Sequence, residues 1–241
     1  MGSRKVLARL AGILYFLIGG AAFNEGYVLP RIVRPGDAAG TAGNIRASAT
    51  LFRLGVLGDL TAGTFWLLAG LALYALLHQV HRLAALAMVT FAAVGAGIQI
   101  LNQVSQYTAL TVATTRSGPD SLVLVLTDMQ RNGYAIDALF FGLWLLPLGY
   151  LVFRSGFLPR AIGVLVAVAG TGYLVYLFAV FLAPGASAGV FGFVTVPCAA
   201  AGELTFMLWL LVRGASDQKR VSGWAGTGSG SSAGTRVRTS S

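Results

Sequence analysis

The sequence predicts an all-α integral membrane protein with six transmembrane helices. Its 241 residues are 56% hydrophobic and only 10% charged, a composition typical of chains embedded in a bilayer. Six apolar stretches are each long enough to cross the hydrocarbon core, which takes about 20 residues. The basic residues gather mostly at the ends of these stretches and in the C-terminal tail, as expected where they set orientation in a membrane.

The six predicted spans cover residues 6–28, 50–77, 83–109, 133–153, 160–183 and 190–212. Together they form a transmembrane domain over 1–213. From residue 214 the chain becomes rich in Gly, Ser and Thr and has little to bury, which predicts a disordered cytoplasmic tail over 214–241. The first span also has features of a cleaved signal peptide, but five further spans follow and no clean cleavage site appears.

The distribution of lysine and arginine predicts the orientation of the bundle. With the N-terminus inside, eleven of the 17 Lys and Arg residues lie on the cytoplasmic side and the other six on the outer side. An excess of basic residues marks the cytoplasmic face of a membrane protein. We therefore expect both termini in the cytoplasm. Because orientation explains the net charge of +9, nucleic acid is not an expected partner.

The two long outer connections carry helix signals. Asp37 is a suitable N-cap for a short helix over the sequence AAGTAGNIRAS. Ser117 or Asp120 can cap a second helix over SLVLVLTDMQR, whose apolar residues share one face at helical spacing. We predict a short amphipathic helix in each loop, anchoring the chain at the membrane surface or, as the less favoured alternative, forming a lid.

The sequence predicts an internal repeat over the first four spans, and the alternative is chance matching in a biased composition. A shift of 78 residues superimposes residue types that are rare in this composition. The matches include Arg53 with Arg131, Gly55 with Gly133, Asp59 with Asp137, Asn24 with Asn102 and Trp66 with Trp144. A fainter third copy of the pattern aligns Glu203 with Asp59 in the sequence. This pattern predicts three parallel helical hairpins, related by an axis along the membrane normal.

Charged residues inside these spans need partners. Asp59 shares a helical stripe with Gly55, Gly63 and Trp66, so it lies on a face that another helix can approach closely. Arg53 lies about 120° around the same helix, so the two cannot pair locally. Ionisable groups at this depth cost roughly 2.5–3.5 kcal/mol and usually face a bundle interior.

We predict a ligand-binding site in the outer half of the bundle. Asp59 and Asp137 form its core, and Arg53 and Arg131 lie at its mouth. The other candidate residues are acids and amides at similar depth: Asn24, Glu25, Gln99, Asn102, Gln103 and the deeper Glu203. Such groups can coordinate a small molecule, an ion or a lipid. The alternative interpretation is a buried polar network that fixes the register of the helices.

No catalytic motif accompanies these residues. The sequence lacks the H-E-x-x-H, G-x-S-x-G, P-loop and dinucleotide patterns. His78 and His81 supply too few ligands for a zinc site, and no cofactor is expected. A binder or transporter is therefore favoured. The alternatives are an intramembrane enzyme acting on a lipid-like substrate, which the missing motifs disfavour, and a structural or partner-binding membrane protein.

Four phrases of the sequence resemble a known family. These are VRPGDAAGTAGNI, LFRLGVLGDL, YLVFRSGFLPRAIGVLVAVAGTGYL and GELTFMLWLLVRG. In combination they are similar to the bacterial membrane family catalogued as domain of unknown function 4386, over residues 6–213. The resemblance implies a multi-pass protein of the bacterial plasma (inner) membrane. It implies no catalytic residue and no substrate, because the family's activity is unassigned.

Overall fold

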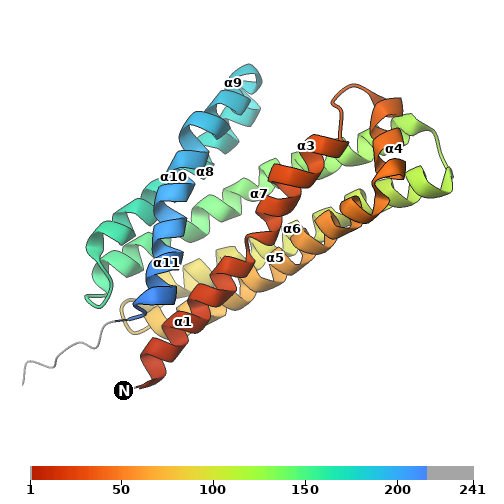
Figure 1. Ribbon diagram of the computed structural model, residues 1–241. Helices are drawn as coiled ribbons and strands as arrows, with labels where there is room; N and C mark the ends of the chain where they lie inside the picture. Colours follow the sequence, from red (N-terminus) through yellow and green to blue (C-terminus); the bar gives the residue numbers. More distant parts are fainter. Residues whose placement is uncertain (1, 216–241) are drawn as a thin grey trace, which may run out of the picture.

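The computed structural model describes residues 2–215, and this part of the chain contains helices and no strands. Six helical segments within it are long and apolar enough to cross a membrane (Figure 1). The predicted fold class, an all-α integral membrane protein with six spans, is therefore confirmed. The predicted tail over 214–241 lies outside the described residues from position 216 onward.

Four of the six spans are single helices, and two are interrupted by π-helical turns. Span 1 consists of α1 (Gly2–Leu17), α2 (Gly20–Phe23), η1 (Asn24–Val28) and α3 (Leu29–Ile32). Spans 2 to 5 are α5 (Ala49–Leu77), α6 (Arg82–Thr115), α7 (Asp120–Arg154) and α8 (Arg160–Leu182). Span 6 consists of α9 (Pro184–Val190), η2 (Phe191–Thr195), α10 (Val196–Ala199), η3 (Ala200–Leu204) and α11 (Thr205–Val212).

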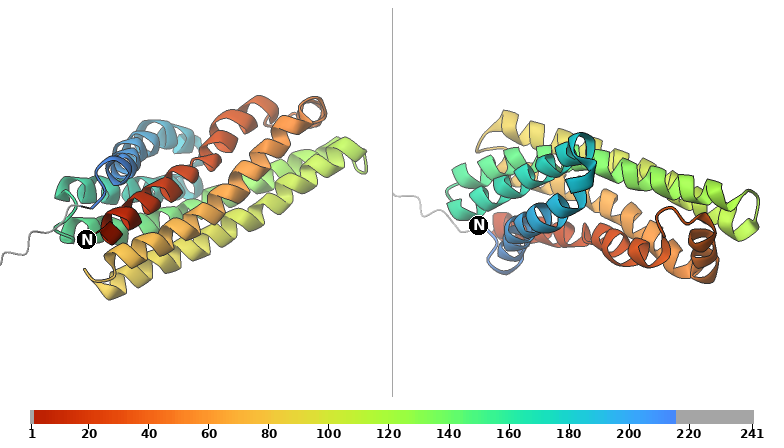
Figure 2. Two further views of the ribbon diagram at one scale, coloured as in Figure 1. Left: turned by 60° about the horizontal axis from the view of Figure 1, so that its bottom comes forward. Right: turned by 90° about the horizontal axis from the view of Figure 1, so that it is seen from above.

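The spans pack in chain order, and the last returns to the first. Each span contacts its neighbours in the sequence, and α1 also packs against α11. Figures 1 and 2 show both described ends of the chain side by side at one end of the bundle, with the turns at 78–81 and 155–159. We call this the terminal end, and the opposite one the far end. The first and last spans therefore complete a ring of helices.

Large apolar side chains lie on both the inward and the outward faces of the helices. Trp66 and Trp144 are fully buried and meet edge to face, with ring centroids 5.8 Å apart. Many large apolar side chains point outward instead, among them Leu101, Phe181 and Phe193. In water such a surface would be unfavourable, whereas in a bilayer it contacts lipid. The outward face therefore fits a membrane-embedded bundle.

Several helices extend beyond the predicted spans at the far end of the bundle. Span 1 continues to Ile32, span 3 continues to Thr115 and span 6 begins at Pro184. Hydropathy gives the end of an apolar stretch of sequence, which need not be the end of the helix. A helix can continue past that point because its backbone hydrogen bonds do not depend on side-chain polarity.

The helix predicted after Asp37 is present as α4 (Ala38–Ala47). Asp37 Oδ1 accepts a hydrogen bond from the Gly40 amide at 2.8 Å, as an N-cap does. The helix packs against α5, α6 and α7 at the far end, and Arg46 pairs with Asp120 at 3.0 Å. It is thus docked on the bundle through packing and an ion pair.

The prediction of a separate amphipathic helix in the second loop was wrong. Its residues are the first turns of α7, which runs unbroken from Asp120 to Arg154, and neither Ser117 nor Asp120 caps it. Gly133 lies inside this helix and costs about 1 kcal/mol relative to alanine. That cost is small beside the contacts that this segment makes with spans 1 and 3.

Candidate functional site

The two interrupted spans carry polar side chains at their π-helical turns. η1 precedes Pro30 closely, and η2 and η3 flank Pro197. Proline lacks an amide donor and clashes with the carbonyl four residues earlier, which disturbs the regular helix. The π turns hold Asn24 and Glu25 in span 1 and Glu203 in span 6. Such turns are frequent at functional sites.

Asp59 lies inside a network of amide side chains. It is fully buried, and its Oδ2 accepts hydrogen bonds from Asn24 Nδ2 at 2.6 Å and from Gln103 Nε2 at 2.9 Å. Asn24 also exchanges hydrogen bonds with Gln106, and Gln99 Nε2 lies 3.5 Å from the Asp59 carbonyl oxygen. This network joins spans 1, 2 and 3.

A second polar group lies nearer the far end. Gln130 Nε2 donates to Glu25 Oε1 at 2.7 Å, and Asn102 Nδ2 donates to the Gln130 carbonyl at 2.7 Å. Glu25 and Arg131 both line a small cavity of about 190 Å³. These contacts join spans 1, 3 and 4.

The two arginines predicted at the mouth of the site do not contact its acids. Arg131 forms an ion pair with Asp128 at 2.7 Å on its own helix. Arg53 is exposed, and within residues 2–215 it has no hydrogen-bond or ion-pair partner. The structure therefore joins Asp59, Glu25 and the predicted amides in two networks without the arginines at their centre. The other two predicted acids, Asp137 and Glu203, belong to neither network.

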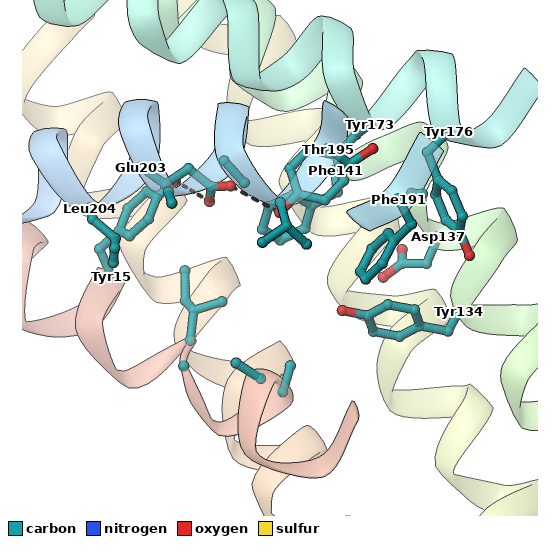
Figure 3. Close-up of a pocket in the computed structure, with 18 of the residues that line it drawn as sticks. Tyr15, Tyr134, Asp137, Phe141, Tyr173, Tyr176, Phe191, Thr195, Glu203 and Leu204 are labelled. Atoms are coloured by element: carbon teal, nitrogen blue, oxygen red, sulfur yellow. Dashed lines mark hydrogen bonds between the residues drawn. The ribbon is translucent and has the colours of Figure 1, made fainter. Parts of the chain in front are cut away.

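A larger cavity of about 410 Å³ lies between spans 1, 4, 5 and 6, and Gln99 of span 3 also lines it (Figure 3). Most of its wall is aromatic or made of small apolar residues. Its polar lining residues are Tyr15, Gln99, Tyr134, Asp137, Tyr173, Tyr176, Thr195 and Glu203. Its lining contains two carboxylates and no Lys, Arg or His. Asp59 is not among the lining residues.

Glu203 occupies one end of this cavity and is hydrogen-bonded through both oxygens. Tyr15 donates to Oε2 at 2.8 Å and Tyr173 donates to Oε1 at 3.0 Å. The carboxylate therefore ties span 6 to spans 1 and 5. Figure 3 shows these bonds well apart from Asp137.

Asp137 occupies the other end and lacks such donors. It is only 4% exposed, and its Oδ1 atom is buried without a hydrogen-bond partner in the described part of the chain. Figure 3 shows its carboxyl group at the end of the cavity where Tyr134, Tyr176 and Phe191 also lie. Leaving a buried polar atom unpaired costs about 1–3 kcal/mol and more for a charged group, so this arrangement calls for an explanation.

The sequence analysis missed the aromatic part of this wall. Tyr15 and Tyr173 lie near the middle of their spans, whereas tyrosines of membrane proteins are enriched at the interfaces. A buried tyrosine usually finds a partner for its hydroxyl group. Tyrosines at mid-span were therefore a usable signal that an acceptor such as Glu203 lies opposite them.

These features define a six-span integral membrane protein with a cavity between its spans that two carboxylates line. The family described as domain of unknown function (DUF4386) matches residues 10–214, and the chain belongs to this family. An uncharacterized protein of Archaeoglobus fulgidus is 34% identical over 76 residues, which are 32% of this chain. The match spans 43% of that protein, so the chain covers less than half of its length. No solved structure matches the chain.

Proposed function

We propose that this protein binds a membrane-soluble small molecule or lipid in the 410 Å³ cavity and acts as a binder or transporter of it. The observation that carries the proposal is Asp137, a buried carboxylate that lines this cavity and has one oxygen without a hydrogen-bond partner in the described part of the chain. Ligand cavities are typically about 300–1,000 Å³ in volume and mostly apolar, with a few polar groups that orient the ligand. This cavity has that size and composition.

The proposal divides the predicted site residues by role. Asp137, Glu203 and Gln99 line the cavity and are the proposed ligand-binding residues. Asp59 and its amide partners are proposed to hold spans 1 to 3 in register, since Asp59 Oδ2 accepts two hydrogen bonds from these amides and Asp59 does not line the cavity. The other candidates, Glu25, Asn102, Arg53 and Arg131, are assigned no direct contact with the ligand.

Native mass spectrometry tests this proposal. The full-length protein, extracted gently from its own membrane, is expected to carry a discrete added mass that the Asp137→Asn variant loses. Asp128→Asn serves as the matched control, because Asp128 is on the same helix but pairs with Arg131 and does not line the cavity. The control should keep the added mass. A bare wild-type protein would favour the structural or partner-binding alternative.

We also propose that the terminal end of the bundle faces the cytoplasm of a plasma membrane. The excess of basic residues supports this orientation, and the turns at the terminal end are flanked by Arg82, Arg154 and Arg160. In a bacterial host, a green fluorescent protein fused to the C-terminus is expected to fluoresce, and an alkaline phosphatase fused there to be inactive. An active phosphatase with a dark fluorescent fusion would reverse the orientation.

A further inference from the structure

We propose that the ligand of the large cavity is an amphiphilic amine, with an ammonium group held at Asp137 and an apolar body. The inference rests on the proposed function and specifies the chemical class of ligand for the same cavity. Three properties of the wall support it: its charge, its aromatic rings and its apolar remainder.

The charge of the wall favours a cation. Both ionisable groups that line the cavity, apart from tyrosines, are carboxylates. Glu203 already accepts hydrogen bonds from two tyrosine hydroxyls, whereas Asp137 Oδ1 has no donor within residues 2–215. A bound ammonium would supply the missing opposite charge in a setting of low polarity, where charge pairing is strong. An anionic ligand would face two carboxylates and no basic side chain.

The aromatic rings distinguish a cation from a neutral hydrogen-bond donor. Tyr134, Tyr176 and Phe191 line the end of the cavity that holds Asp137 (Figure 3). Aromatic faces attract cations, and quaternary ammonium groups are bound by cages of such rings. A neutral alcohol would need only the carboxylate. The combination of an unpaired acid with several rings is therefore best matched by an ammonium group.

The rest of the wall suits an apolar body. Gly19, Ala21 and Ala22 of span 1 face the cavity, as do Ala199 and Ala200 of span 6. These residues have small or absent side chains and leave room between the spans. They offer no polar partner, so the portion of the ligand beyond the ammonium is expected to be hydrocarbon or aromatic.

The test compares two probes of nearly the same shape. Benzyltrimethylammonium carries the cation, and 2,2-dimethylpropylbenzene replaces its nitrogen by carbon and is neutral. Binding to the full-length protein in neutral maltoside micelles is measured by calorimetry, with empty micelles subtracted. We expect the ammonium probe to bind roughly tenfold or more tightly than the neutral probe, from the combined carboxylate and ring contacts.

Three variants decide which contacts produce this preference. Asp137→Asn should weaken binding of the ammonium probe by roughly tenfold or more and leave the neutral probe unchanged. Phe191→Leu, at a position that is 37% exposed, removes a ring but keeps an apolar side chain, so it should reduce only the binding of the ammonium probe. Asp128→Asn should change neither.

The outcomes separate this inference from the proposed function. Equal binding of the two probes, or no binding of the ammonium probe, would overturn the ammonium assignment. The cavity would still be a binding site if native mass spectrometry showed an added mass that Asp137→Asn loses. If the wild type carried no added mass, or if Asp137→Asn kept it, the proposed function itself would be overturned.

Discussion

Replacing Asn24 with leucine is expected to destabilise the folded protein by about 3 kcal/mol or more. The variant removes the 2.6 Å hydrogen bond to the fully buried Asp59 and both hydrogen bonds to Gln106. Each buried polar group left unpaired costs about 1–3 kcal/mol, and a charged group costs more. Denaturant unfolding in maltoside micelles, followed by tryptophan fluorescence, measures the change.

Asn102→Leu is the matched control for this variant. A Cβ on Gly55 would overlap Asn24 Oδ1, and a Cβ on Gly133 would overlap Asn102 Oδ1, so both asparagines pack tightly against a glycine. The crowding caused by leucine is therefore similar at the two positions. Within residues 2–215 the Asn102 side chain donates only to the Gln130 carbonyl, so its loss is expected to cost about 1 kcal/mol. Equal losses would mean that the Asp59 network contributes little stability.

A double variant isolates the role of the carboxylate. If the unpaired charge of Asp59 causes the loss, the Asn24→Leu/Asp59→Leu protein should be more stable than Asn24→Leu alone. Contacting residues commonly show coupling energies of about 0.5–3 kcal/mol in such cycles. Additive losses would assign the effect to packing rather than to the hydrogen bonds of Asp59.

The sequence was sufficient to predict the six spans, because about 20 consecutive apolar residues have few other structural explanations. It was insufficient at the far end, where polar residues such as Gln130 lie within a continuous helix. Hydropathy reports the polarity of side chains. Gln130 instead contacts Glu25 and Asn102, which are remote in sequence, so its polar groups have partners inside the bundle.

The candidate site was predicted in part for a similar reason. Spacing along each helix placed Asp59 and the amides at one depth, and the structure joins Asp59 to Asn24 and Gln103. The contact between Tyr15 and Glu203 joins residues 188 positions apart and exists because span 6 returns to span 1. The periodicity of residues within one helix does not predict that span 6 packs against span 1.

The repeat also could not show that its two aspartates differ in environment. Asn24 donates to Asp59, whereas the equivalent Asn102 donates to a backbone carbonyl, so Asp137 has no amide donor from it. The π turn η1 begins at Asn24, while α6 is regular through Asn102, and such a turn changes the direction of side chains. The internal repeat itself stays a prediction, supported by the matching contacts of the two asparagines with glycine.

Filling the large cavity with an indole ring is the second change with a large expected effect. Several residues line the cavity and are also exposed at the surface of the bundle, including Phe16 and Ala22 in span 1 and Ala200 and Leu204 in span 6. The cavity therefore reaches the lipid-facing surface between these two spans. Spans 1 and 6 pack together through α1 and α11 at the terminal end, and Figure 1 shows them diverging beyond it. We expect a ligand to enter there from the bilayer.

Ala22→Trp and Ala200→Trp should each reduce the fraction of protein that carries the native ligand by roughly tenfold or more, since overpacking a fitted site costs about 1–3 kcal/mol. Both positions are exposed, so the indole can project into the cavity without displacing buried core residues. Ala93→Trp is the matched control, because Ala93 is exposed on α6 and does not line the cavity. Native mass spectrometry should show the added mass on the wild type and on the control, and unfolding measurements should show similar stability for all four proteins. If both tryptophan variants kept the full added mass, the ligand would have to occupy a different part of the molecule, because an indole at either position takes up space that the cavity ligand requires.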